Sequence, residues 1–469
     1  MIRVKAFAGK TVAVFGMARS GLAAARSLVA GGAAVACWDD GTRGRAAAEA
    51  AGLPLVDLHD ADWSKFAALV LTPGVPLTHP EPHWTVAKAQ AAAVEVIGDT
   101  ELFFRELETR PDATGPKVIA ITGTNGKSTT TALTAHLLRH AGKRVAMGGN
   151  IGEAVLGLEP FTEVDVYVLE LSSYQIDLTP ALNPDAGILL NLSPDHLDRH
   201  GSMEHYAEVK GRLVMGAKTA IVGLDDPWCR AMATSLLAAG KPLMALHVET
   251  DSTRPADAVR PTDVTPFLRA NILAVAPLRD VPTLRGPHNA QNAAAANCAA
   301  LALFPELDQQ MLLAGLESFP GLAHRMELLG SLAGVPYVND SKATNADAAA
   351  KALASCGRHL HWILGGQAKE GGIKSLAPFF RNVRRAYLIG AASETFAATL
   401  SEHQVDFIRC ESLEKAVAAA ATARKGTVIL SPACASFDQF KDFEDRGDQF
   451  RKLVQALPGF EPYATNARI

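Results

Sequence analysis

The sequence predicts an α/β protein with three domains. Its 469 residues exceed one ordinary core, short apolar strands alternate with helical stretches, and proline and glycine separate three such segments. In the first segment we expect a strand at Thr11–Phe15, a turn at Gly16–Gly21, a helix at Leu22–Val29 and a strand at Ala34–Trp38. This order is a βαβ unit, and it predicts a Rossmann-like N-terminal domain.

The second segment begins with a strand at Val118–Gly123, and a glycine-containing loop leads from it into a helix near Ser128–His140. The apolar runs VYVLE and GILLN follow as further strands. The third segment starts near Gly321, where VPYVND, HLHWILGG, AYLIG and GTVILSP alternate with alanine-rich helical stretches such as Ala346–Ala354. We expect an α/β domain of the P-loop ATPase type in the second segment and a Rossmann-like domain in the third.

The domain boundaries follow from two candidate linkers, Thr109–Lys117 and Phe319–Arg325, where proline and glycine interrupt the periodic pattern. We therefore divide the chain into residues 1–108, 109–321 and 322–469. The polar stretch Asp251–Asp263 is an insertion or a hairpin, and its structure stays unassigned.

Composition narrows the class of partner. Apolar residues make up 48% and charged residues 20%, and the net charge of −4 has no long block of one sign, so we expect neither a nucleic-acid nor a membrane partner. No apolar stretch approaches the span of a bilayer, and Arg19 and nearby glycines interrupt the apolar start too early for an export signal. Six scattered cysteines without a Cys-x-x-Cys pair argue against a zinc site or a disulfide framework. These features predict a cytoplasmic protein that acts on small molecules, and we expect a monomer.

The strongest local signal is TGTNGKSTTT, directly after a predicted strand and at the start of a predicted helix. Gly123 and Gly126 let backbone N–H groups approach phosphate oxygens. Lys127 can reach the terminal phosphates, and Ser128 can ligate Mg²⁺. The usual pattern has another glycine where this chain has Ile121, so the loop is a variant. A glycine turn with an exposed lysine is the alternative, but the flanking strand and helix favour a nucleoside triphosphate site.

These residues resemble the ATP loop of the Mur ligase family, which also includes folylpolyglutamate synthetases. Further blocks follow in the order of that family: GGNIG at 148–152, ELSSYQ at 170–175, NLSPDHLDRH at 191–200, GPHNAQN at 286–292, HR at 324–325, NDSKATN at 339–345, LGG at 364–366 and SPACASFDQF at 431–440. The blocks cover nearly all of the second and third segments. NDSKATN and the last two blocks resemble the family member that adds D-glutamate to UDP-N-acetylmuramoyl-L-alanine.

The resemblance implies a site for ATP and Mg²⁺. The ATP contacts that it implies are Gly123, Thr124, Asn125, Gly126, Lys127, Ser128, Thr129, Asn289, Asn292, Arg325, Asp340 and Lys342. The metal ligands that it implies are Ser128, Glu170, His196 and Lys210, with Lys127, His196 and Lys210 as the catalytic residues. Lys210 would be a carbamate, whose anionic oxygens suit Mg²⁺. The alternatives are ordinary structural roles, with Glu170 facing water, His196 satisfied within the fold and Lys210 solvated on a helix.

The resemblance also implies sites for the two other substrates. The contacts implied for the UDP-linked substrate are Gly16, Arg19, Ser20, Gly21, Asp39, Asp40, Thr72, Pro73, Gly74 and Asn150. Those implied for D-glutamate are Thr344, Lys369, Ser436 and Phe443, where Lys374 is a close alternative to Lys369. Ala18 replaces the middle glycine of a dinucleotide fingerprint, which weakens the case for close backbone contact with a pyrophosphate.

The activity implied is amide formation through an acyl phosphate, in which ATP phosphorylates a carboxylate and the amine of an amino acid displaces the phosphate. A sister ligase such as a folylpolyglutamate synthetase is the nearest alternative, and the N-terminal βαβ unit argues against it. A nicotinamide-dependent dehydrogenase would explain Gly16–Gly21 followed by Asp39, but it leaves the Lys127 loop without a purpose. A non-catalytic nucleotide-binding module is the third alternative.

Overall fold

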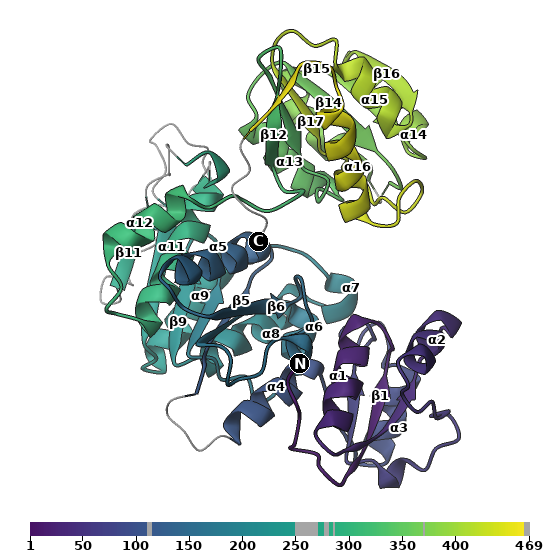
Figure 1. Ribbon diagram of the computed structural model, residues 1–469, viewed down its shortest axis with the longest axis vertical. Helices are drawn as coiled ribbons and strands as arrows, with labels where there is room; N and C mark the ends of the chain where they lie inside the picture. Colours follow the sequence, from purple (N-terminus) through teal and green to yellow (C-terminus); the bar gives the residue numbers. More distant parts are fainter. Residues whose placement is uncertain (110–114, 249–270, 276–280, 285–286, 369–370, 464–469) are drawn as a thin grey trace. The chain divides into compact units, whose positions relative to one another are not determined.

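The computed structural model describes residues 1–109, 115–248, 271–275, 281–284, 287–368 and 371–463. These residues form two compact units, one comprising residues 1–280 and 287–318 and the other residues 281–286 and 319–469. Each unit is an α/β assembly built on mainly parallel sheets (Figure 1). The predicted α/β class is therefore confirmed, while Asp251–Asp263 lies outside the described residues. Within the described part, no helix has both the length and the apolar character needed to cross a bilayer.

The first unit contains a four-stranded parallel sheet of order β2-β1-β3-β4. The strands are β1 (Thr11–Phe15), β2 (Ala34–Trp38), β3 (Ala68–Leu71) and β4 (Glu95–Ile97). The accompanying helices are α1 (Arg19–Ala30), α2 (Thr42–Ala50), α3 (Trp84–Ala91) and α4 (Asp99–Glu108). Both predicted strands have the expected bounds. Helix α1 begins three residues earlier than predicted, because Gly16 turns the chain sharply with φ of 91° and Leu22 N–H already bonds to Ala18 O.

The same unit contains a seven-stranded parallel sheet of order β11-β10-β9-β8-β5-β7-β6. Its strands are β5 (Lys117–Thr122), β6 (Val145–Gly149), β7 (Val166–Glu170), β8 (Ala186–Leu189), β9 (Thr219–Gly223), β10 (Leu243–Val248) and β11 (Asn271–Val275). Its helices are α5 (Lys127–His140), α6 (Ser173–Asp177), α7 (Leu197–His200), α8 (Met203–Gly216), α9 (Pro227–Ala238), α11 (Pro287–Leu303) and α12 (Gln309–Glu317). Helices α5 and α11 pack side by side (Figure 1).

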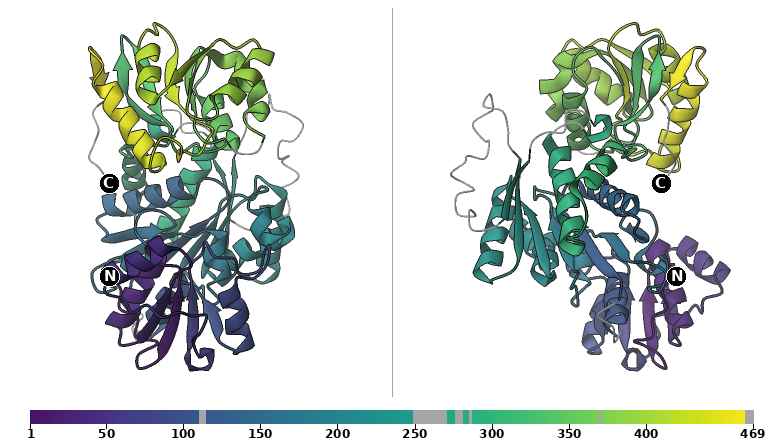
Figure 2. Two further views of the ribbon diagram at one scale, coloured as in Figure 1. Left: turned by 90° about the vertical axis from the view of Figure 1, so that its right-hand side faces the viewer. Right: turned by 60° about the vertical axis from the view of Figure 1, so that its left-hand side comes forward.

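The second unit contains a seven-stranded sheet of order β16-β15-β14-β17-β13-β12-β18. Its strands are β12 (Glu327–Leu332), β13 (Val335–Asn339), β14 (Leu360–Gly365), β15 (Val383–Ile389), β16 (Phe407–Glu411), β17 (Thr427–Leu430) and β18 (Phe460–Pro462). Its helices are α13 (Ala346–Ser355), α14 (Ser393–Glu402), α15 (Leu413–Ala420) and α16 (Phe443–Gln455), which flank both faces of the sheet (Figure 2).

Strand β12 runs opposite to the other strands of this sheet, which the sequence analysis did not predict. Strand β12 pairs antiparallel with β13 and with β18. Ala333 and Gly334 form the two-residue turn between β12 and β13, with φ of 50° and 78°, as a type I′ hairpin requires. The expected parallel Rossmann arrangement therefore ends in an antiparallel edge.

Strand β14 shows how the sheet is buried on both faces. Trp362 packs into one apolar cluster, and its neighbour Ile363 packs into another on the opposite face. The indole Nε1–H of Trp362, which is fully buried, donates to Ser431 O at 2.7 Å. The side chain of Ser431 in turn donates to Asp340 Oδ2 at 2.9 Å. The apolar core thus positions a carboxylate at the carboxyl edge of the sheet.

We predict that Trp362→Phe lowers the unfolding free energy of the second unit by about 1–3 kcal/mol. The substitution removes the hydrogen bond to Ser431 O and leaves space beside it. Urea unfolding followed by circular dichroism measures the change. Ile408→Val serves as the control because this side chain is exposed, and its effect should stay within about 0.5 kcal/mol. Equal stabilities of the Trp362 variant and the parent would contradict the assigned role.

Candidate active site

The predicted phosphate loop joins β5 to α5 at the carboxyl edge of the central sheet. Gly123 and Gly126 have φ of 149° and 85°, a region that favours glycine. A Cβ atom on Gly126 would lie 2.4 Å from Asn292 Oδ1, so a larger residue has no room there. Gly126 caps α5 without a side chain, and the first N–H groups of the helix therefore carry their partial positive charge toward this edge.

Hydrogen bonds from neighbouring segments hold this loop in place. Asn191, which follows β8, accepts from Thr124 N at 2.8 Å through its carbonyl and from Asn125 N at 2.9 Å through its side chain. The Thr124 hydroxyl also lies 3.1 Å from Tyr206 OH. Lys127 Nζ donates to Gly123 O and to Thr124 O, both at 3.0 Å. The lysine ammonium is therefore held directly above the backbone of the loop.

Two asparagines from α11 lie beside the start of α5. Asn292 is buried, accepts from Thr130 Oγ1 at 3.1 Å and donates to Asn289 Oδ1 at 3.0 Å. These contacts join the predicted positions Asn289 and Asn292 to the helix that begins at the phosphate loop. Ser128 is half-buried and Thr129 is buried in the first turn of that helix.

Glu170 ends β7 next to this loop and is only 2% exposed, so the water-facing alternative for this residue is wrong. Its Oε1 accepts from Asn150 Nδ2 at 2.8 Å. Its Oε2 is buried and has no hydrogen-bond partner among the described residues. A buried carboxylate oxygen without a partner is costly, and a hard cation would satisfy it. Asn150 contacts this carboxylate, although the resemblance assigned it to the UDP-linked substrate.

Lys210, on α8, is 2% exposed, so the solvated-helix alternative is also wrong. Its Nζ donates to Thr122 Oγ1 and to Gly123 O, both at 3.0 Å. Burial lowers the pKa of Lys210 well below its ordinary value, and the nearby charge of Lys127 lowers it further. An amine with a lowered pKa is more often uncharged, and the uncharged amine is the form that reacts with CO₂.

His196 caps α7 in a left-handed conformation with φ of 52°. Its ring lies 5.1 Å from the Tyr174 ring, and its Nε2 lies 3.5 Å from Asp195 Oδ2. The side chain is about half exposed, and its partial removal from water lowers the pKa of His196. The charge of Asp195 opposes this shift, and the charges of Lys210 and Lys127 add to it. His196 is therefore exposed to the positive charge of the same two lysines that surround the phosphate loop.

The N-terminal sheet presents the predicted turn after β1. A Cβ atom on Gly16 would lie 2.0 Å from Thr72 Oγ1, and one on Gly21 would lie 1.8 Å from Gly16 O, so both glycines are required for packing. Met17 N donates to Asp39 Oδ2 at 2.6 Å. Arg19 donates to Gly152 O, and Ser20 lies half-buried in the first turn of α1.

Asp40, at the carboxyl edge of the same sheet, lies in an aromatic group that the sequence analysis missed. Its carboxylate lies 3.1 Å from His83 Nε2 and accepts from Trp84 Nε1 at 3.2 Å. The Trp84 ring stacks on His59 with centroids 3.8 Å apart. Only Asp40 was predicted, because these aromatic side chains lie far from it in the chain, at the start of α3 and in the segment before η1 (Trp63–Lys65), and belong to no recognisable motif.

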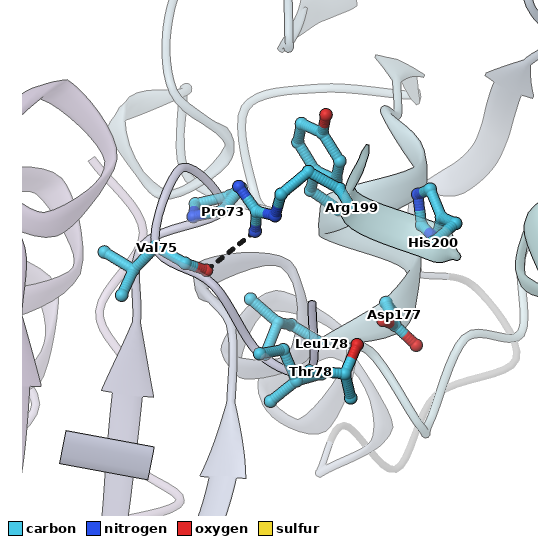
Figure 3. Close-up of a pocket in the computed structure, with 9 residues that line it drawn as sticks. Pro73, Val75, Thr78, Asp177, Leu178, Arg199 and His200 are labelled. Atoms are coloured by element: carbon cyan, nitrogen blue, oxygen red, sulfur yellow. Dashed lines mark hydrogen bonds between the residues drawn. The ribbon is translucent and has the colours of Figure 1, made fainter. Parts of the chain in front are cut away.

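The loop containing Thr72, Pro73 and Gly74 contacts Arg199 of α7. The guanidinium of Arg199 donates to Gly74 O and to Val75 O, both at 2.9 Å. Figure 3 shows the bond to Val75. Pro73 and Arg199 line a small pocket at this place. The sequence analysis quoted the block that contains Arg199 but did not predict this contact.

In the second unit, Asp340 follows β13 and is buried. Its Oδ1 accepts from Met326 N at 3.2 Å, and its Oδ2 accepts from the Ser431 hydroxyl. Burial raises the pKa of Asp340 to about 7. Lys342 Nζ lies 3.9 Å from the centre of the Phe443 ring, which joins a predicted nucleotide contact to a predicted D-glutamate contact. The predicted nucleotide contact Arg325 directly precedes Met326, whose N–H donates to Asp340.

The remaining D-glutamate positions lie in loops of the second unit. Ser436 is 2% exposed, and Thr344 is half-buried. Arg446 is fully buried and donates to Cys434 O and to Ser341 O. These two bonds hold in place the segments that carry Ser436 and Thr344. Lys369 lies outside the described residues, and Lys374 begins a 3₁₀ helix at 374–382.

Comparison with known proteins gives close relatives over the whole chain. The UDP-N-acetylmuramoylalanine–D-glutamate ligase of Nitrobacter hamburgensis is 55% identical and covers 99% of this chain and 100% of its own length. The protein of the same name from Caulobacter sp. strain K31 is 52% identical and covers 97% of this chain and 98% of its own length.

Solved structures show the same fold at low identity. The UDP-N-acetylmuramate–alanine ligase of Thermotoga maritima has a TM-score of 0.59 at 17% identity, with 95% of this chain and 99% of that chain covered. A pseudomurein peptide ligase of Methanothermus fervidus has a TM-score of 0.52 at 19% identity, again covering 95% and 99%.

Family models match two regions of the sequence. The Mur ligase middle domain matches residues 121–300, and the glutamate ligase domain of Mur ligases matches residues 324–434. Together with the relatives that share more than half of their residues along the full length, these matches establish that the chain belongs to the Mur ligase family.

Proposed function

We propose that the protein is an ATP-dependent ligase that joins D-glutamate to UDP-N-acetylmuramoyl-L-alanine in peptidoglycan precursor synthesis. One observation carries the proposal. The phosphate loop with Lys127, the buried carboxylate of Glu170 and the buried amine of Lys210 all lie at the carboxyl edge of one parallel sheet. The names of the full-length relatives specify the two substrates.

ATP and Mg²⁺ fit this edge. The positive φ angles of Gly123 and Gly126 let the loop backbone turn its N–H groups toward phosphate oxygens, and Lys127 supplies a cation beside them. Glu170, His196, Ser128 and carbamylated Lys210 would hold Mg²⁺, which supplies charge neutralisation for the phosphates. The orphaned Oε2 of Glu170 is the feature that a hard cation suits best.

The reaction has two steps. A carboxylate oxygen of UDP-N-acetylmuramoyl-L-alanine attacks the γ-phosphorus of ATP, the bond to the β-phosphate oxygen breaks, and ADP leaves. Lys127 stabilises the negative charge that moves onto the bridging oxygen. The amine of D-glutamate then attacks the acyl phosphate, inorganic phosphate leaves, and the amine loses a proton. The products are an amide, ADP and phosphate.

The three ranges of the chain divide the substrates. We assign residues 1–108 to the UDP-linked substrate, residues 109–321 to ATP, and residues 322–469 to D-glutamate and further nucleotide contacts. The Asp40 group with His83 and Trp84 offers hydrogen-bonding and stacking surfaces suited to a nucleobase. Within the second unit, Ser436, Thr344 and Phe443 are the described D-glutamate candidates, and Lys369 remains a candidate from the sequence. The protein would act in the cytoplasm as a monomer.

The alternatives explain less of the molecule. A folylpolyglutamate synthetase-like ligase would use the same phosphate loop but would give no role to the N-terminal sheet with Asp39 and Asp40. A nicotinamide-dependent dehydrogenase would leave Glu170 and Lys210 without a reaction. The decisive assay measures phosphate release from ATP. Release should require both UDP-N-acetylmuramoyl-L-alanine and glutamate, and D-glutamate should give the amide product while L-glutamate should not.

Lys127→Ala should lower kcat/KM for ligation about 10³-fold, because the transferring phosphoryl group loses a fixed cation. Coupled measurement of ADP formation gives this ratio. Lys65→Ala is the matched control, since this lysine is on the surface with a side chain 76% exposed, and it should keep the parent rate. A Lys127 variant that forms product as fast as the parent would contradict the proposed mechanism.

Lys210 should carry a carbamate, formed when its uncharged amine attacks CO₂ and loses one proton. In CO₂-free buffer the activity should fall about tenfold or more, and added bicarbonate should restore it, because the Mg²⁺ site loses an anionic ligand. Native mass spectrometry should show the mass of one added CO₂, which Lys210→Ala should lack. Activity independent of CO₂ would refute the carbamate.

Asp340→Asn should gain stability relative to the parent as the pH rises. Burial raises the pKa of Asp340 from 3.8 to about 7, so across this window the folded state binds a proton that the unfolded state has lost. The parent therefore loses stability as the pH rises through the window, and the variant lacks this loss. Thermal unfolding at several pH values between about 4 and 8, the range that these two pKa values bound, measures this difference in stability. Parallel Tm curves would contradict the expectation.

A further inference from the structure

Three side chains with metal-binding chemistry converge outside the proposed Mg²⁺ site. Asp177 ends α6, His200 ends α7, and His205 lies in the first turn of α8. One ligand atom from each residue lies within 4.8 Å of the corresponding atoms of the other two. Asp177 and His200 lie next to each other in the lining of the small pocket (Figure 3). The cluster contains no cysteine, so the cysteine pattern of the sequence could not reveal it.

His200 supplies a second, independent observation. The residue is 3% exposed, and its Nε2 lies 2.9 Å from Ser173 Oγ. Its Nδ1 is buried and has no hydrogen-bond partner within the described parts of the chain. A neutral imidazole that donates Nε2–H to Ser173 presents a lone pair at Nδ1, which is the state of a metal-ligating histidine oriented by a second partner. A bound cation would satisfy this buried nitrogen.

The charges around the cluster allow a divalent ion. Asp177 Oδ1 accepts from Arg212 Nη1 at 3.0 Å, which leaves its second oxygen for a ligand. Glu208 lies one turn after His205, with its Oε2 3.9 Å from His205 Nδ1, and it is a candidate fourth ligand. Asp177 and Glu208 thus place two carboxylates near the histidines, and the guanidinium of Arg212 pairs with both.

We propose that Asp177, His200 and His205 form a site for a divalent transition-metal ion of the zinc class, distinct from the Mg²⁺ site at Glu170. Two imidazoles and a carboxylate are ligands that Zn²⁺ prefers, whereas Mg²⁺ prefers oxygen ligands alone. Zinc–ligand bonds of about 2.0–2.1 Å place tetrahedral ligand atoms about 3.3 Å apart. The three ligand atoms thus need to converge by about 1.5 Å at most, and Asp177 and His205 are only partly buried and can rotate.

The ion would join three helices, and two of them, α7 and α8, carry candidate catalytic residues. His196 caps the same α7 that ends at His200, and Lys210 lies on α8 five residues after His205. Because a metal that binds the folded state alone stabilises that state, Zn²⁺ should stiffen this region. A polar junction between helices, held by Arg212 without a metal, is the competing explanation.

The test uses the full-length, metal-free protein, dialysed against Zn²⁺ in a large excess of Mg²⁺, with bound zinc measured by elemental analysis. The parent should retain one Zn²⁺ per chain, and its Tm should rise by several degrees. His205→Gln and Asp177→Asn should each weaken Zn²⁺ affinity about tenfold or more and abolish the rise in Tm. These two partly buried residues are preferred to the buried His200, whose replacement could prevent folding.

Two controls separate the outcomes. His403→Gln changes an exposed histidine of the second unit and should bind Zn²⁺ like the parent. His196→Gln should also bind like the parent if the new site is separate from the Mg²⁺ site. Equal zinc retention by the parent, His205→Gln and Asp177→Asn would overturn the proposal. Loss of zinc in His196→Gln alone would overturn it too, because Zn²⁺ would then occupy the Mg²⁺ site.

Discussion

The shared carboxyl edge of β5, β7 and β8 is the constraint on which the rest of the site depends. Adjacent parallel strands end at the same edge of a sheet, so the loop after Thr122, the carboxylate of Glu170 and the side chain of Asn191 meet there. Lys210 joins them from α8 by donating to Thr122 and Gly123. Every catalytic role proposed for the first unit follows from this convergence.

Burial at that edge also sets the chemistry of the side chains. The amine of Lys210 is removed from water and lies near Lys127, so its charged form is disfavoured, whereas the carboxylate of Glu170 has one oxygen that no described group satisfies. The uncharged amine of Lys210 is suited to react with CO₂, and the unsatisfied carboxylate oxygen of Glu170 is suited to bind a cation. In the second unit, burial likewise disfavours the charged form of Asp340 and raises its pKa to about 7.

Local patterns predicted several of the strands and helices, and the loop chemistry. The strands Thr11–Phe15 and Ala34–Trp38 and the strand before Gly123 lie where apolar runs indicated them, because a buried parallel strand needs a short continuous apolar run. Strands β12 and β18, which pair antiparallel with each other, were missed. Their pairing depends on a tight turn at Ala333 and Gly334 and on the distant C-terminal segment, which periodicity does not register.

By itself, the sequence determined the α/β class, the phosphate loop with Lys127 and the family resemblance, since these depend on residues adjacent in the chain. Only the tertiary structure decided that Lys210 and Glu170 are buried and not solvated, and that Asp40 lies against Trp84. It also decided that His200 lies in a cluster with Asp177 and His205, and that its buried Nδ1 has no hydrogen-bond partner among the described residues. The reason is physical: burial and unsatisfied polar atoms depend on which distant segments exclude water, and local sequence carries no measure of that exclusion.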